Sequence, residues 1–141
     1  MTKREKALKV INEMHKKGIL KDYAIGGAVA TIFYTEPFFT RDIDIFFIPA
    51  EKKGIPIQFI PATTELEIEA LKNAIDAKVK DINIRVLRPE YLIAIFLKVF
   101  RSKDKEKIRM IAEQAEIDKK LLSDILDRYK LKKRFWELLN E

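Results

Sequence analysis

The sequence predicts a fold of the α/β or α+β class, in which a small mixed sheet of about four strands is covered by helices and followed by a helical C-terminal tail. The chain has 141 residues, of which 48% are hydrophobic, and this suits the core of a single domain. Strand-like runs lie within residues 1–88, whereas helical periodicity continues through residues 89–141. We therefore expect one domain, residues 1–141, with its sheet in the first part.

The first third of the chain predicts a helix, a strand and a second helix. Apolar residues recur at helical spacing through residues 3–17. The apolar run of residues 23–25 predicts a short strand that ends at Gly26-Gly27, and residues 28–34 then resume helical spacing. A glycine turn should therefore join the first strand to the second helix.

The middle of the chain predicts three more strands. Residues 42–48 alternate charged and apolar side chains before they become continuously apolar. Residues 55–60 predict a strand that pairs with them through a polar turn. Residues 82–87 alternate strictly and predict the fourth strand.

Helices are predicted between and after these strands. One should begin at Glu65, capped by Thr63 or Thr64, with an apolar stripe that reaches Ile75. Pro89 suits the first turn of another helix, and helical spacing then continues to the end of the chain. Phe135 and Trp136 should dock the last helix on the core rather than stack on a base.

Composition excludes several kinds of site. Because the chain has no cysteine and one histidine, carboxylates remain as the protein ligands for a metal ion. No apolar run approaches the roughly 20 residues that span a bilayer, so we expect a cytoplasmic protein without a membrane partner. The net charge of +6, concentrated after Lys98, favours polyanions such as nucleotides or RNA, although a solubilising surface would have the same composition. Abundant Ile, Lys and Glu also fit a heat-adapted source.

Asp42 and Asp44 are the first candidate site residues. They lie two positions apart on a predicted strand, where alternate side chains share a face. Neighbouring carboxylates raise each other's pKa unless a cation neutralises them, and Mg²⁺ or Mn²⁺ prefers oxygen ligands. The pair therefore predicts a divalent metal site. The alternative is a solvated pair bonded to an arginine such as Arg41.

Gly26 and Gly27 are the second candidate. Glycines between a strand and a helix let the backbone approach a phosphate, and the N-terminus of the helix offers unpaired N–H groups and a favourable dipole. The turn therefore predicts a phosphate site, and the alternative is a tight turn without a ligand.

Several segments, taken in order, resemble the signature of the polymerase-β-like nucleotidyltransferase superfamily: Gly26-Gly27-Ala28, Tyr34-Thr35-Glu36-Pro37 and Thr40-Arg41-Asp42-Ile43-Asp44. In that superfamily a glycine turn precedes a helix and an Asp-x-Asp strand. The later run Pro89-Glu90-Tyr91-Leu92-Ile93-Ala94, with Lys98, Arg101, Lys103 and Asp104, resembles the third motif of the AbiEii/AbiGii toxin-type branch. Arg128-Tyr129-Lys130-Leu131 and Trp136 are similar to the tail of these proteins.

The resemblance implies transfer of a nucleoside monophosphate from an NTP to a hydroxyl of RNA or protein, with Mg²⁺ or Mn²⁺ held by Asp42 and Asp44. It implies that the nucleotide is bound by Gly26, Gly27, Thr40 and Lys103. It also implies that Lys98, Arg101 and Lys103 offset charge on the leaving group, and that Asp104 orients them. A toxin-type enzyme would also have an antitoxin partner. The alternative for this basic helix is a solvated charged face.

One position departs from the superfamily pattern. Active members usually carry a third carboxylate on the next strand, and this chain has Gln58 there. A glutamine cannot act as a general base, although its carbonyl oxygen can ligate a hard cation. Asp81 or Glu51 could substitute for the missing acid. Two further hypotheses therefore stay open: an inactive relative that binds nucleotide, RNA or a partner protein on the same surface, and a nucleic-acid-binding module that uses the basic C-terminal helices.

Overall fold

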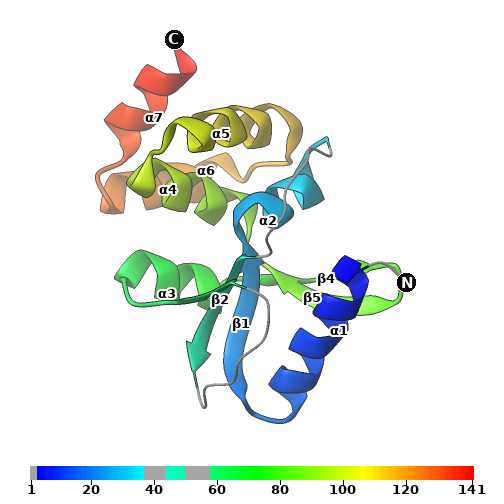
Figure 1. Ribbon diagram of the computed structural model, residues 1–141. Helices are drawn as coiled ribbons and strands as arrows, with labels where there is room; N and C mark the ends of the chain where they lie inside the picture. The colour runs from blue at the N-terminus through cyan, green and yellow to red at the C-terminus, as the bar shows by residue number, and fades with distance from the viewer. Residues whose placement is uncertain (1–2, 37–43, 50–57) are drawn as a thin grey trace.

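The described residues form a five-stranded mixed sheet with helices packed around it and a group of helices beyond one of its ends (Figure 1). The computed structural model describes residues 3–36, 44–49 and 58–141. The elements, in chain order, are α1 (Lys3–Lys16), β1 (Leu20–Gly26), α2 (Gly27–Tyr34), β2 (Asp44–Pro49), β3 (Gln58–Pro61), α3 (Glu65–Lys72), β4 (Ile75–Val79), β5 (Ile82–Val86), α4 (Pro89–Val99), α5 (Ser102–Gln114), α6 (Lys119–Arg128) and α7 (Lys132–Leu139).

The strand order of the sheet is β3-β2-β1-β5-β4. β1 runs antiparallel to β2 and parallel to β5, while β3 runs parallel to β2 and β4 antiparallel to β5. The last residues of β1 and β5 therefore lie at the same end of the sheet as the first residues of β2 and β3. We call this end, marked by Gly26, the glycine end.

Two predictions about the sheet are wrong. The sheet has five described strands rather than four, because Ile75 belongs to β4 and not to the preceding helix. α3 stops at Lys72, and β4 then pairs with β5 through a turn at Lys80 and Asp81. β3 does pair with β2, but in the parallel sense rather than as a hairpin.

The helix predictions at residue 65 and at Pro89 are confirmed. The Oγ1 atom of Thr64 accepts a hydrogen bond from the backbone N–H of Glu67 at 3.2 Å, and the Glu67 carboxylate accepts one from the N–H of Thr64 at 3.1 Å. This reciprocal pair satisfies two N–H groups that the first turn of α3 would otherwise leave unpaired. Pro89 occupies the first turn of α4, as its fixed φ favours.

α4 is the central helix of the molecule. It contacts α2, α3, α5 and α6, so it is buried on nearly every side. Its buried residues include Leu92, Ile93 and Leu97, and apolar side chains of this size each contribute about 1.5–3 kcal/mol when fully buried. None of the described helices has the length and apolar character needed to cross a bilayer.

α2 lies between the sheet and the C-terminal helices (Figure 1). It continues directly from β1 at the glycine end and contacts α4 and α5. α1 packs against β1 and β5, and α3 packs against β1, β2 and α4. The glycine end of the sheet therefore faces the helical part of the molecule.

Candidate active site

The turn between β1 and α2 contains a helix N-terminus whose N-cap residue is a glycine. Gly26 is buried, and Gly27 has a φ of +59°, in the left-handed region that favours glycine. Because glycine has no side chain, the N-cap residue Gly26 provides no capping hydrogen bond to the first N–H groups of α2. Such groups bind anions, because the helix dipole adds positive potential there. The turn therefore fits a phosphate.

β2 begins beside this turn. The backbone of Asp44 pairs with Gly26 on β1 and with Gln58 on β3, so three predicted positions are neighbours at the glycine end. Thr40, Asp42 and Glu51 lie outside the described residues.

Asp81 does not lie near the glycine end and cannot replace the missing third acid. It stands in the turn between β4 and β5, at the opposite end of the sheet. Because β5 separates this turn from Leu87, where the chain reaches the glycine end, the strand itself keeps the carboxylate away from Asp44.

The segment after α2 is held by hydrogen bonds to other elements. The Tyr34 hydroxyl donates to the carbonyl oxygen of Leu87 at 2.9 Å, and burial raises the pKa of this tyrosine. Thr35 donates to the carbonyl oxygen of Thr31 at 2.8 Å, and the N–H of Glu36 donates to Gln114 at 2.7 Å. These bonds fix the end of α2 against β5 and α5.

The predicted basic residues lie at the far end of α4 from the strands. α4 starts three residues after the end of β5, and its 11 residues span about 16 Å. Lys98, Arg101 and Lys103 are exposed at the corner where α4 ends and α5 begins. They are therefore about one helix length from the glycine end, within reach of an extended ligand rather than in contact with the turn.

Asp104 is fully buried, and its carboxylate bonds to Arg101. It accepts hydrogen bonds from the Arg101 backbone N–H and Nε, both at 3.0 Å, and from Nη2 at 3.2 Å. One carboxylate therefore caps the first turn of α5 and fixes a guanidinium group. The resemblance implied that Asp104 orients Lys98, Arg101 and Lys103; its described hydrogen bonds are to Arg101, and a role in the site stays a prediction.

Glu90 is a buried acid that joins two helices. Only 1% of its side chain is exposed, and the carboxylate accepts hydrogen bonds from Arg88 Nε at 3.2 Å and from the N–H of Asp118 at 3.0 Å. Asp118 is the N-cap of α6. Glu90 therefore connects the start of α4 to the start of α6, and this contact explains why an acid stands in an otherwise apolar segment.

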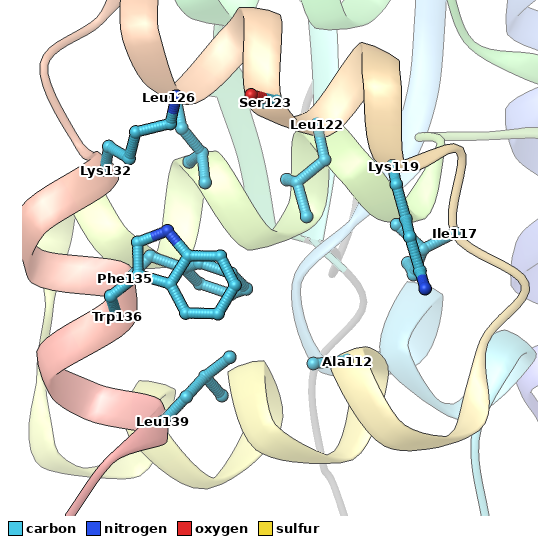
Figure 2. Close-up of a pocket in the computed structure, with 10 residues that line it drawn as sticks. All are labelled: Ala112, Ile117, Lys119, Leu122, Ser123, Leu126, Lys132, Phe135, Trp136 and Leu139. Carbon is cyan, nitrogen blue, oxygen red and sulfur yellow. The ribbon is translucent and has the colours of Figure 1, made fainter.

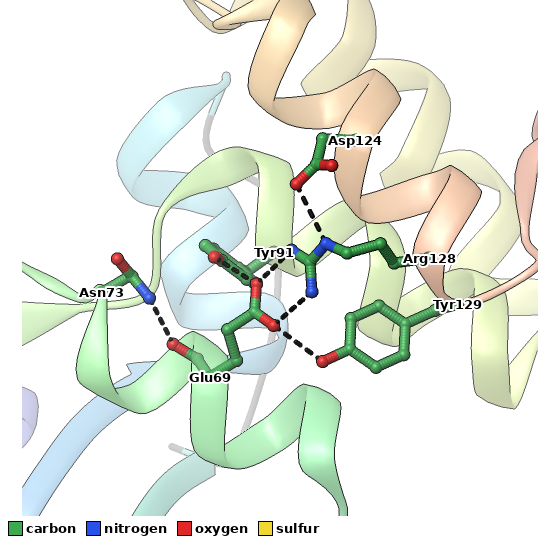
Figure 3. A network of polar contacts seen from close by, with 6 residues as sticks. All are labelled: Glu69, Asn73, Tyr91, Asp124, Arg128 and Tyr129. Carbon is green, nitrogen blue, oxygen red and sulfur yellow. Dashed lines mark hydrogen bonds and ion pairs between the residues drawn. The ribbon is translucent and has the colours of Figure 1, made fainter.

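A polar cluster that the sequence did not predict joins α3 to the helical part (Figure 3). The Glu69 carboxylate accepts two hydrogen bonds from Arg128, at 2.6 and 2.7 Å, and one from each hydroxyl of Tyr91 and Tyr129, both at 2.7 Å. The hydrogen bonds from Arg128 lower the pKa of Glu69 to about 2. Arg128 also bonds to Asp124. We call these five residues the Glu69 cluster. Its hydrogen bonds join α3 to α4 and α6, which is a structural role that we call a clasp.

An apolar cavity lies between α5, α6 and α7, away from the strands (Figure 2). Its volume is about 290 Å³, and Leu122, Phe135, Trp136 and Leu139 line it. Phe135 is buried, as expected for a residue that docks α7 on the core, whereas Trp136 is 54% exposed. The expectation that both aromatic residues dock α7 is therefore correct for Phe135 and only partly correct for Trp136.

Among the side chains that the structure describes, no three His, Asp or Glu residues lie close enough together to hold a metal ion. The geometry at the glycine end thus consists of an uncapped helix N-terminus, an aspartate in register with a glycine, and a glutamine beside them. Comparison with models of protein families gives no match to this chain, and comparison with curated proteins gives none either.

Proposed function

We propose that this protein is a metal-dependent nucleotidyltransferase that moves a nucleoside monophosphate from an NTP to a hydroxyl of RNA or protein. The observation that carries the proposal is the register of Asp44 with Gly26 and Gln58 beside the uncapped start of α2. This register supports a site in which an acidic strand and a phosphate-binding turn serve one ligand.

The oxygen donors at the glycine end suit Mg²⁺ or Mn²⁺. Asp42 and Asp44 would hold the ion, and Gln58, whose backbone is in register with Asp44, carries an amide oxygen as a further hard donor. When bound, a dication neutralises phosphate charge and makes the α-phosphorus easier to attack. These residues match the coordination preferences of the proposed ion.

The chain's own groups would bind and orient the substrate. The N–H groups of Gly27 and the first turn of α2 would hold the β- and γ-phosphates, and the resemblance adds Thr40 to the nucleotide-binding residues. Lys98, Arg101 and Lys103 would attract a polyanionic part of an extended ligand, and Asp104 keeps Arg101 in position.

In the proposed reaction the acceptor oxygen forms a bond to the α-phosphorus while the bond between this phosphorus and the bridging oxygen of pyrophosphate breaks. The acceptor hydroxyl loses its proton in the same step. Gln58 cannot take that proton, so it passes to an aspartate carboxylate or to water. Loss of a dedicated base predicts slow turnover.

The experiment that tests this function measures incorporation of labelled nucleotide from each of the four NTPs into total RNA and protein. We expect incorporation that requires Mg²⁺ or Mn²⁺ and is abolished by Asp44→Ala. Asp81→Ala is the matched control, because it removes an aspartate from the opposite end of the sheet and should retain activity. Equal activity of Asp44→Ala and the unmodified chain would exclude the proposal.

Gln58 favours a second candidate function, in which the same site binds a nucleotide without transferring it. The resemblance implies an acid at this position in active members of the superfamily, whereas this chain has Gln58, in register with Asp44. This candidate predicts nucleotide binding by calorimetry, weakened by Asp44→Ala, with no incorporation from any NTP. Incorporation gained by Gln58→Asp alone would further support it. The toxin-type role and its antitoxin partner rest on the resemblance, and co-purification from the native host would test them.

A further inference from the structure

Two cationic side chains from different helices contact the ring of Phe100. The Lys105 Nζ atom lies 4.9 Å from the centroid of the Phe100 ring, and the guanidinium carbon of Arg134 lies 4.9 Å from the same centroid. Lys105 belongs to α5 and Arg134 to α7, so only the tertiary structure brings them together. Cations beside an aromatic ring are attracted to its electron-rich face, and the ring thus offsets part of their mutual repulsion.

Arg134 is held in a defined position. Its Nη1 atom donates to the carbonyl oxygen of Leu97 at 2.7 Å, which satisfies one of the carbonyl groups that the end of α4 leaves unpaired. Phe100 follows α4 with a φ of +57°, a left-handed conformation that turns the chain sharply into α5. The backbone of the α4–α5 corner is therefore well defined, and at least one of its cations, Arg134, is held in place by a hydrogen bond.

Few acidic side chains of the described residues neutralise the positive charge at this corner. Lys98, Lys105 and Arg134 form no ion pair with any acid of the described residues. Two acids flank Lys105 in the chain: Asp104 is fully buried and bonded to Arg101, and Glu106 pairs with Arg109 at 3.7 Å. α5 also begins here, so the positive end of its dipole adds to the potential.

We propose that this corner, with Lys105 and Arg134 at the Phe100 ring and Lys98 in the last turn of α4, binds the phosphate backbone of single-stranded RNA. Several cations spread over a helix corner suit a chain of spaced phosphates better than one compact anion. Val99, 59% exposed at the same corner, offers apolar contact to a base. A membrane surface fits less well, because no broad apolar face surrounds these cations in the described part of the chain.

The corner lies close enough to the proposed nucleotidyltransfer site for one RNA strand to reach both. The corner lies about 16 Å along α4 from the glycine end, so an RNA strand bound there could present a hydroxyl at the proposed site. This second step rests on the proposed function and names RNA as its acceptor. RNA binding itself does not depend on catalysis and can be measured alone.

The test measures binding of a fluorescein-labelled, single-stranded oligoribonucleotide of about 12 nucleotides by fluorescence anisotropy over a range of salt concentrations. The test variant is Lys98→Ala/Lys105→Ala, which leaves Arg134 in place because that residue supports the end of α4. The matched control is Lys119→Ala/Lys120→Ala at the start of α6, which removes the same charge elsewhere. Circular dichroism melts of all three proteins check that each is folded.

We expect the test variant to bind RNA about tenfold more weakly than the unmodified chain, and the control to change affinity less than about twofold. The slope of log K against log salt should fall by about 1.4 in the test variant, since each lost phosphate contact on a single strand contributes about 0.7. Equal losses in both variants would overturn the proposal, and so would unchanged binding in the test variant. Competition by polyglutamate as effective as that by unlabelled RNA would instead assign the corner to an acidic protein. Binding to phosphatidylserine vesicles that the test variant loses, without RNA binding, would assign it to a membrane.

Asp44→Ala separates this inference from the proposed function. It should retain RNA binding at the corner while nucleotide transfer disappears. RNA binding by the unmodified chain without any transfer would contradict the proposed function alone. If the unmodified chain transfers nucleotide to protein but does not bind RNA, only the proposal of RNA binding at the corner is contradicted.

Discussion

Gly27 has a backbone conformation that other residues adopt only with strain. Its φ of +59° lies in the left-handed region, and a Cβ atom there costs about 1–2 kcal/mol. We therefore expect Gly27→Ala to lower the free energy of unfolding by about that amount and to weaken NTP binding, because the turn must shift away from its phosphate-binding shape. Urea unfolding and calorimetry with a non-hydrolysable NTP analogue measure the two effects.

Gly18 supplies the matched control for this substitution. It also has a positive φ, +75°, nothing lies within 4 Å of a Cβ atom built there, and it precedes β1 at the end of the strand opposite Gly26. Gly18→Ala should therefore lose similar stability without any change in nucleotide affinity. Equal nucleotide affinity in the two variants would contradict a phosphate-binding role for the turn that contains Gly27.

The start of α5 depends on Asp104 more than on Arg101. Asp104 is fully buried and accepts three hydrogen bonds, whereas the Arg101 side chain is 55% exposed. Asp104→Ala should lower the free energy of unfolding by about 2 kcal/mol, because it leaves the N–H of Arg101 without its partner, and Arg101→Ala should cost less than about 1 kcal/mol. Thermal unfolding of the two variants checks this order. A larger loss for Arg101→Ala would show that the guanidinium supports the helix itself.

The element that sequence patterns missed is β4. Ile75 lies four residues after Leu71 and so continues the apolar stripe of α3, although residues 75–79 also alternate as a strand does. The turn that joins β4 to β5 has two residues, Lys80 and Asp81, and lacks the glycine or asparagine that usually marks such a hairpin. Lys80 has a φ of +55°, so pairing with β5 stabilises a turn that local preference disfavours.

Some contacts near the candidate site were expected from the sequence, whereas others arise only from the tertiary structure. The resemblance implied one site for the glycine turn and the acidic strand, and the sheet register pairs the backbones of Gly26 and Asp44. The Glu69 cluster had no such signal, because Glu69, Tyr91 and Arg128 come from three separate helices and each one alone fits an ordinary helix surface. Only the packing of α3 against α4 and α6 gives that glutamate its partners.

At the scale of the whole molecule, the Glu69 cluster makes stability depend on pH. The pKa of Glu69 is about 2 in the folded protein and about 4.5 in an unfolded chain, so the unfolded state binds more protons between these values. The stabilising contribution is therefore complete above about pH 5 and is lost as the pH falls towards 2. Because the Arg128 side chain is 43% exposed, solvent screening reduces this contribution to about 1–2 kcal/mol.

Glu69→Gln tests this clasp between the sheet-bearing and helical parts. The variant keeps a side chain of the same shape but loses the charge that Arg128 holds, so its free energy of unfolding should be about 1–2 kcal/mol lower at pH 7. The difference from the unmodified chain should shrink towards zero near pH 2, because protonation then removes the same charge from Glu69. Glu113→Gln, at an exposed position on α5, is the control and should show no such convergence. Urea unfolding at a series of pH values measures both differences, and a Glu69→Gln deficit that stays constant with pH would mean that shape rather than charge joins α3 to α4 and α6.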